Sequence, residues 1–380
     1  MENKTFKALK NAWASFMDTL SEPDEKKDTD KEETPDGIDE AAEPKEDDAA
    51  KDADNEKEAD DRTATAETRD DEPKPVKTHE VRLTTSVNLE TGGYVLGFSI
   101  QGRSHLGEGV PCQDYHAFEN LGDGWLLSIV SDGAGSAREA ARGSKANCEM
   151  AMSMIKKLLK EKEWKEKNYL PTDKEWYIEI RNIFEIMQAV ISEKASELAG
   201  DYKERHGVDL EARDFNATVL VLVVTPKGMM AAHIGDGRMG YLSGNGEWLP
   251  LITPHKGEEA SATVFIPNNW NRQMCIPAFT LSDVYLPDTC VVCERPKAFV
   301  LMSDGCESFS WVCKEYDREK NYYFDRNSPF PQFFNPLIKF LNERKEAPGR
   351  MEEFIEVIDT GTEGGRRESD DRTMLFGVLE

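Results

Sequence analysis

Aspartate residues follow several apolar runs of this chain, and their type and spacing could do chemistry. Asp132 ends the run LLSIVSD, Asp304 ends FVLMSD, and Asp236 follows MMAAHIG. Asp370 and Asp371 directly precede TMLFGV. Carboxyl groups at the ends of core strands can converge in space, where they repel one another unless cations neutralise them. Hard ions such as Mg²⁺ and Mn²⁺ are the usual partners of such oxygen clusters.

A second interpretation of these aspartates is a set of ordinary turns. Glycine follows Asp132, Asp236 and Asp304. Glycine allows a backbone carbonyl to come close to an ion, but Asp-Gly is also a common turn dipeptide. The residues by themselves leave the metal site and the turns about equally supported.

The elements that must position these aspartates are strands and helices between residues 81 and 380. Strand runs alternate with pairs of helices rather than with single helices. This pattern predicts an α+β domain with mainly antiparallel sheets, not a doubly wound nucleotide-binding fold. Strands are expected at 81–89, 94–102, 124–131, 217–252, 297–302 and 373–379, and helices at 136–160, 174–198 and 349–358.

Two further segments precede this domain. In residues 1–20, Phe6, Leu9, Trp13 and Phe16 recur at spacings of three and four, which predicts a short amphipathic helix. Residues 21–80 hold 25 acidic and 10 basic side chains and almost no large apolar ones, which predicts a disordered acidic linker. The helix could dock a partner, fold back on the domain, or lie on a membrane surface.

Composition excludes several classes of protein. The chain has 73 acidic and 47 basic residues and a net charge of −26, so it is a poor general binder of nucleic acid. No apolar run approaches the roughly 18–20 residues of a membrane span, and the secretion-signal pattern is missing. Seven cysteines predict a reducing, cytoplasmic setting. Free, buried thiols are favoured over a zinc site for Cys290, Cys293, Cys306 and Cys313.

Five motifs in a fixed order carry a family resemblance. They are GRSHLGEGVPCQD, IVSDGAGSA, ATVLVLVV with AAHIGDGRMGYL, FVLMSDGCESF, and SDDRTMLFGV. Together, over about residues 92–380, they resemble a metal-dependent protein phosphatase of the type-2C (PPM) family, most of all its divergent bacterial branch. The resemblance implies two packed antiparallel sheets with a helix pair on each outer face. It also implies a serine/threonine phosphoprotein phosphatase with two Mg²⁺ or Mn²⁺ ions and a third, weaker one.

The resemblance also implies roles for individual residues. Asp132 would bridge both ions, and the Gly133 carbonyl would bind one of them. Asp304 and Asp370 would hold the second ion. The water shared by the ions would attack phosphorus without a protein nucleophile. Two further positions match outer ligands: Asp114 through water, and Asp236 for the third ion.

Two positions depart from the family pattern. Gly109 stands where most members have an arginine that grips the substrate phosphate, and Ala134 stands where many have a histidine proposed as general acid. Arg103 is the nearby substitute for the phosphate contact. His105 is a candidate acid or phosphate ligand, although a lone histidine in a strand-loop segment is more often structural.

These departures leave three functions open. The first is an active phosphatase that acts on phosphoproteins beside a Ser/Thr kinase or on the targets of that kinase. The second is a catalytically weak pseudophosphatase that serves as a binding module in a kinase signalling system. The third is a phosphoesterase for small molecules.

Overall fold

The computed structural model describes residues 80–256, 263–267 and 287–379. All of them belong to one compact unit, residues 77–380. The expected helix over 1–20 lies outside the described residues, as does the acidic linker apart from its last residue, and both stay predictions.

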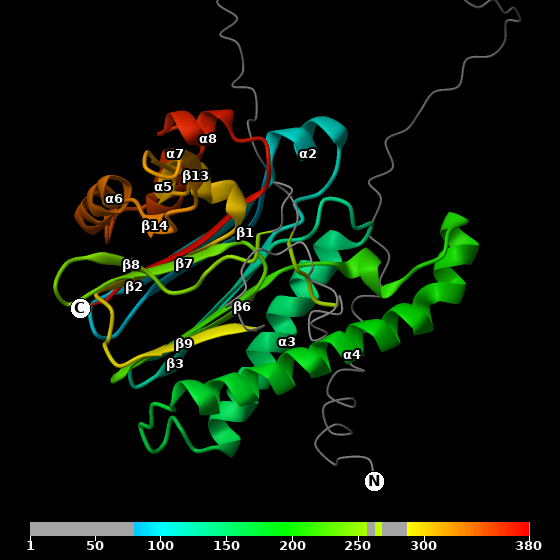
Figure 1. Cartoon of the computed structure of the whole chain (residues 1–380), viewed down its shortest axis with the longest axis horizontal. Helices are drawn as coiled ribbons and strands as arrows, with labels where there is room; N and C mark the ends of the chain where they lie inside the picture. Colours follow the sequence, from blue (N-terminus) through cyan, green and yellow to red (C-terminus); the bar gives the residue numbers. More distant parts are fainter. Residues whose placement is uncertain (1–79, 257–262, 268–286, 380) are drawn as a thin grey trace, which may run out of the picture. The chain divides into compact units, whose positions relative to one another are not determined.

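Two antiparallel sheets form the centre of this unit (Figure 1). The first has six strands in the order β1-β2-β15-β10-β7-β8, and the second has five in the order β3-β4-β5-β6-β9. The first sheet comprises β1 (Val81–Asn88), β2 (Tyr94–Ile100), β7 (Arg238–Leu242), β8 (Trp248–Pro250), β10 (Ala298–Met302) and β15 (Arg372–Val378). The second comprises β3 (Tyr115–Gly122), β4 (Trp125–Ser131), β5 (Val219–Thr225), β6 (Gly228–Ile234) and β9 (Asp288–Val292).

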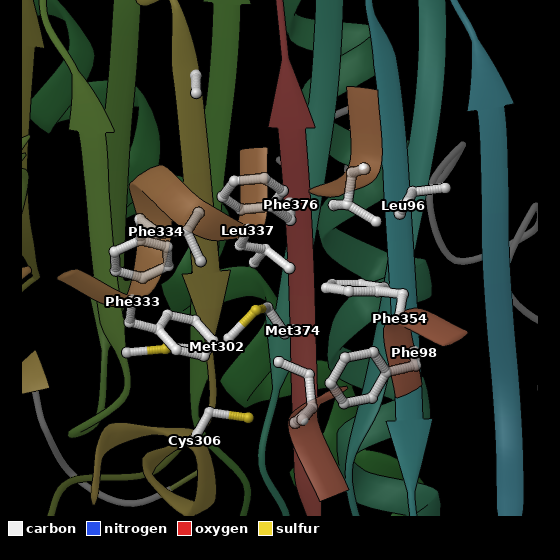
Figure 2. Packing of buried hydrophobic residues seen from close by; sticks show 14 of the residues in the cluster. Leu96, Phe98, Met302, Cys306, Phe333, Phe334, Leu337, Phe354, Met374 and Phe376 are labelled. Carbon is white, nitrogen blue, oxygen red and sulfur yellow. The ribbon is translucent and has the colours of Figure 1, made fainter. Parts of the chain in front are cut away.

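Alternating side chains place the two apolar layers of the core. On β10, Phe299 and Leu301 face the second sheet, and Val300 and Met302 face the opposite side. This is the period of two that a strand imposes. Because the central strands are covered on both faces, they read in sequence as continuous apolar runs. The outer layer includes residues drawn in Figure 2: Leu96, Phe98, Met302, Cys306, Phe333, Phe334, Leu337, Phe354, Met374 and Phe376.

Helices cover the outer faces of both sheets. The long helices α3 (Ala140–Glu161) and α4 (Asp173–His206) pack on the second sheet. The helices α6 (Pro331–Glu343) and α7 (Arg350–Asp359) supply the aromatic layer that covers the first sheet. The predicted α+β fold with a helix pair on each outer face is therefore confirmed. The shorter elements are α2 (Arg103–Glu108), η1 (Ala212–Phe215), η3 (Asp304–Cys306), α5 (Glu307–Ser310), β11 (Trp311–Val312), β12 (Glu315–Asp317), β13 (Tyr322–Phe324), β14 (Ser328–Pro329) and α8 (Glu363–Arg367).

Several elements differ from the sequence prediction, among them the strands β3 and β9, which were not predicted. Helix α4 runs to His206 rather than 198, from a capping box at Thr172 and Glu175 to a left-handed Gly207. Helix α6 was not predicted, although Pro331 at its first position is a helix-start feature. The segment around His105 was interpreted as strand and loop, and it is the helix α2.

Strand register brings the predicted aspartates to one edge of the sheets. Met302, the last residue of β10, pairs with Arg238 at the start of β7 and with Met374 near the start of β15. Tyr115, the first residue of β3, pairs with Ser131, the last of β4. The loops that carry Asp304, Asp236, Asp370, Asp114 and Asp132 therefore all leave the sheets at the same end.

None of the described helices is both long and apolar enough to cross a bilayer. Each of the six cysteines in the described ranges is a free thiol, in agreement with the prediction. Their burial agrees only in part, since Cys306 is buried but Cys293 is exposed and Cys290 and Cys313 are half-buried.

Candidate metal centre

Asp132 and Gly133 directly follow β4, and Gly133 forms an isolated antiparallel β-bridge with Ala217. The backbone N–H of Asp132 donates to Thr218 Oγ1 at 2.9 Å, and its carbonyl accepts from the Thr218 N–H at 2.7 Å. A Cβ on Gly133 would lie 2.8 Å from the carbonyl oxygens of both Gln113 and Ala140, so only glycine fits. The apolar strand thus delivers the Asp132 carboxyl group to the sheet edge with a fixed backbone.

Asp114 is fully buried, directly before β3. Its Oδ2 accepts a hydrogen bond from Ser303 Oγ at 2.7 Å, beside Asp304. Its Oδ1 meets no hydrogen-bond donor in the described part of the chain. A buried carboxylate oxygen without a donor is costly unless a cation or an ordered water serves it.

Asp370 and Asp371 lie at the start of β15 and face different surroundings. The Asp371 carboxylate accepts backbone hydrogen bonds from Gly102 at 2.6 Å and Gln113 at 2.5 Å. It therefore ties both ends of the segment that contains α2 to β15. Asp370 is exposed and accepts the backbone N–H of Asp371 at 2.8 Å.

The electrostatics of these carboxyl groups show that they converge. Burial raises the pKa of Asp132 well above its usual range, and the charges of Asp114, Asp304, Asp370 and Asp236 raise it further. Burial and then the charge of Asp304 raise the pKa of Asp236 to about 8, although Lys256 opposes this. Desolvation by the surrounding protein, and then the charge of Asp304, raise the pKa of Asp370 to about 6.

Asp114 follows the same pattern. Burial raises its pKa well above the usual range, and the charges of Asp371 and Asp370 add to the effect, while the Ser303 hydrogen bond opposes it. A divalent cation bound among these carboxyl groups would relieve the electrostatic repulsion between them.

The donor set fits a hard divalent ion. It consists of carboxylate oxygens and one backbone carbonyl, and sulfur and imidazole donors are not among the predicted ligands. Within residues 80–256, 263–267 and 287–379, no three His, Cys, Asp or Glu side chains are already arranged closely enough to hold an ion. The convergence of charge, rather than a preformed ligand cage, is therefore the structural basis for this centre.

Comparison with known protein families identifies the family of this chain. The family model for protein phosphatase 2C matches residues 101–356, which is more than half of the chain. The chain belongs to the protein phosphatase 2C family. It is therefore a phosphoprotein phosphatase, a hydrolase of a metal-dependent family.

Individual relatives of this 2C-type phosphatase are bacterial. It is 32% identical over 286 residues to serine/threonine-protein phosphatase 3 of Escherichia coli K12, across 74% of this chain and 96% of that protein. Serine/threonine phosphatase Stp1 of Staphylococcus aureus shares 13% identity with a TM-score of 0.45, over 79% of this chain and 98% of that one. RsbX in complex with magnesium shares 13% identity with a TM-score of 0.41, over 78% and 100% of the two chains.

Arg103 and His105 of this 2C-type phosphatase both lie on α2. His105 Nδ1 is 2.9 Å from Asp371 Oδ1. The Arg103 guanidinium is partly exposed, donates to the Arg366 carbonyl, and lies 3.3 Å from Asp359 Oδ1. Both side chains are thus bound to the segments around β15.

The two departures from the family pattern have structural reasons in this phosphatase. Gly109 ends α2 with φ of 70°, a left-handed conformation that would strain an arginine. Ala134 is buried in a small cluster with Ala137 and Ala140, against the partly buried Phe265. The Ala134 side chain therefore packs in an apolar contact in this chain.

Three charged residues beside the centre were missed or undervalued from sequence. Glu307, three residues after Asp304, accepts hydrogen bonds from Lys256 Nζ at 2.8 Å and from Arg238 Nε at 2.8 Å. Burial by itself would raise the pKa of Glu307, but Arg238 and Lys256 outweigh it and lower the pKa. His255, the residue before Lys256, is buried and stacks on His233 at 4.2 Å between ring centroids.

Proposed function

We propose that this chain removes phosphate from serine and threonine residues of proteins, using water activated by bound Mg²⁺ or Mn²⁺. The observation that carries the proposal is the convergence of carboxyl groups at one sheet edge, where burial and neighbouring carboxylates raise the pKa values of Asp132, Asp114 and Asp236. The name of the Escherichia coli relative, a serine/threonine-protein phosphatase, supports the substrate class.

We assign two ions to this edge, with a third bound more weakly. Asp132 would hold both ions, the Gly133 carbonyl one of them, and Asp304 and Asp370 the second. Asp114 would act through water, which its buried Oδ1 without a donor supports, and Asp236 would hold the third ion. When bound, such ions would supply an activated water and stabilise charge on the phosphoryl oxygens.

The side chains of α2 supply the remaining steps. Arg103 is the proposed contact for the substrate phosphate, and its partial exposure supports this role. His105 is the proposed general acid. Because its Nδ1 faces Asp371, its Nε2 is the nitrogen that would donate a proton to the leaving oxygen.

The biological setting of the reaction follows from the substrate class. We propose a phosphoprotein partner that a Ser/Thr kinase also acts on, and the cytoplasm as the compartment, which the free thiols support. A weakly active binding module is the second candidate function, because Gly109 and Ala134 remove two side chains that many family members use.

The deciding experiment measures phosphate release by the purified full chain after EDTA treatment and addition of Mn²⁺. An aryl phosphate and a phosphothreonine peptide are both expected to be hydrolysed only with the ion. Binding of the peptide with release of neither phosphate would favour the binding module. Hydrolysis of small esters but never of peptides would favour a small-molecule phosphoesterase.

A further inference from the structure

A pocket opens beside the candidate metal centre. Its volume is about 640 Å³, and its lining includes Asp304 and Asp370. It extends from these carboxyl groups along α5, β11 and the residue that precedes α6. A ligand in this pocket would therefore touch the proposed reaction centre at one end.

The lining of the pocket also holds three aromatic side chains, together with the charged Glu307, Lys314 and Glu368. Among the aromatic residues, Phe309 and Trp311 are buried and Phe330 is 37% exposed. Single exposed apolar side chains are ordinary on protein surfaces, whereas groups of them are informative. Here the neighbouring hairpin of β12 and β13 exposes further ones: Tyr316, Tyr322, Tyr323 and Phe324.

The aromatic wall is tied firmly to the metal edge. Arg238, fully buried two residues after Asp236, donates to Glu307 Oε2 at 2.8 Å, Asp325 Oδ2 at 2.7 Å and Asn327 Oδ1 at 2.9 Å. Trp311 Nε1 donates to the same Asn327 oxygen at 3.0 Å. These hydrogen bonds connect the aromatic wall of the pocket to the edge that carries the aspartates.

We infer that this pocket binds the polypeptide that flanks the phosphorylated residue, and that it selects a bulky apolar side chain there. The inference rests on the proposed function, because the aspartate end places the phosphate. A volume of about 640 Å³ corresponds to roughly 9 Å in each direction, and an extended chain advances about 3.3 Å per residue. The preferred side chain lies within about three residues of the phosphorylated one.

The test is a four-way comparison with the full chain and Mn²⁺. Phosphothreonine peptides carry phenylalanine or alanine at one flanking position, scanned from one to three residues on either side. Each peptide is measured with the wild-type chain and with Phe330→Ala. In the wild type, phenylalanine at the best position should raise kcat/KM about tenfold, mainly through KM, and Phe330→Ala should remove most of this advantage.

Matched variants separate contact from structural damage. Phe330→Leu should restore much of the preference, and Ile178→Ala, which truncates a 45% exposed side chain on α4, should leave it intact. General damage lowers kcat/KM for both peptides equally and leaves their ratio unchanged. An equal preference in wild type and Phe330→Ala therefore overturns the inference.

Two further results separate failure of the proposed function from failure of the inference. If neither peptide nor aryl phosphate is hydrolysed with Mn²⁺, the proposed function itself fails. Hydrolysis of aryl phosphate without any flanking preference defeats only the inference.

Discussion

Burial raises the pKa of Asp132, and the charges of four other carboxyl groups raise it further. We expect Asp132→Asn to lower kcat by at least about a hundredfold, because the bridging charge is lost. In the metal-free protein the same change should raise the melting temperature, because it removes a repulsion. Asp304→Asn and Asp370→Asn should also abolish turnover, and EDTA should reproduce all three.

Aryl-phosphate turnover with Mn²⁺ and thermal melts without it measure both effects. Asp201→Asn, at an exposed position on α4, is the matched control and should change neither. Turnover near the wild-type rate in Asp132→Asn would refute the proposed centre.

Asp236 gives the metal-free protein a stability that depends on pH. Its folded pKa of about 8 lies above the unfolded value, so the folded state binds more protons and loses stability as pH rises toward 8. Between pH 7 and 8.5 the melting temperature should fall, by on the order of 2–5 °C from this group. Below pH 6.5 three buried neutral histidines have the opposite effect, so that stability rises with pH. They are His116, His233 and His255, whose pKa values are lowered by burial.

Thermal melts of the EDTA-treated chain at these two pH values test this prediction. Asp236→Asn cannot titrate and should show a smaller fall. An identical fall in the variant would assign the effect to other groups.

Arg103 is the residue proposed to hold the substrate phosphate. Arg103→Ala should raise KM for phosphopeptides more than it lowers kcat, as loss of uniform binding does. Arg103→Lys, which keeps the charge, should recover part of the affinity. Steady-state kinetics and thermal melts distinguish a phosphate-binding role from a structural one. An unchanged KM with a lowered melting temperature would show that Arg103 serves only the structure, through its contacts with Asp359 and Arg366.

At the scale of elements, one buried carboxylate joins α7, α2 and β15. Asp359 lies 2.7 Å from the fully buried Arg372 and 3.3 Å from Arg103. Asp359→Ala leaves the Arg372 charge buried without this partner, which costs about 3–5 kcal/mol. The expected result is a large fall in the free energy of unfolding, measured by urea titration.

Glu356→Ala is the control on the same helix, because Glu356 is exposed. Asp359→Ala should also lose more turnover than its unfolded fraction accounts for. The reason is that Arg372 directly follows Asp370 and Asp371. An unfolding free energy within about 1 kcal/mol of wild type would show that other contacts of Arg372 suffice.

At the scale of the whole molecule, the predicted metal residues all lie after residue 80. A chain that begins at residue 81 should therefore fold and hydrolyse an aryl phosphate at close to the full-length rate. Its action on a physiological phosphoprotein should fall if residues 1–20 dock that partner, because a tether raises effective concentration. Thermal melts and aryl-phosphate turnover of the two chains measure this. A large drop in melting temperature would mean that the helix packs on the domain.

The sequence by itself determined most strands of the two sheets, the two long helices and the candidate aspartates, whereas β3 and β9 were not predicted. Central strands are apolar because both of their faces are covered, and the aspartates that follow β4 and β10 stand out against them. Helix α6 was missed although Phe334, Leu337 and Leu341 follow a helical spacing, because Pro336 stands inside the pattern and proline ordinarily interrupts a helix. Helix α2 was missed because its six residues bury no side chain.

Only the tertiary structure decided which of these residues meet. The register of β3 and β4 sets Asp114 opposite Asp132. The pairing of β10 with β7 and β15 brings the ends of these strands to one edge. The spacing of residues in the sequence does not reveal which distant strands pair. The tertiary structure also decided that His105 faces Asp371 and that Arg238 ties the aromatic pocket to the metal edge. Such contacts depend on long-range packing, whereas strand and helix patterns depend on neighbours in the chain.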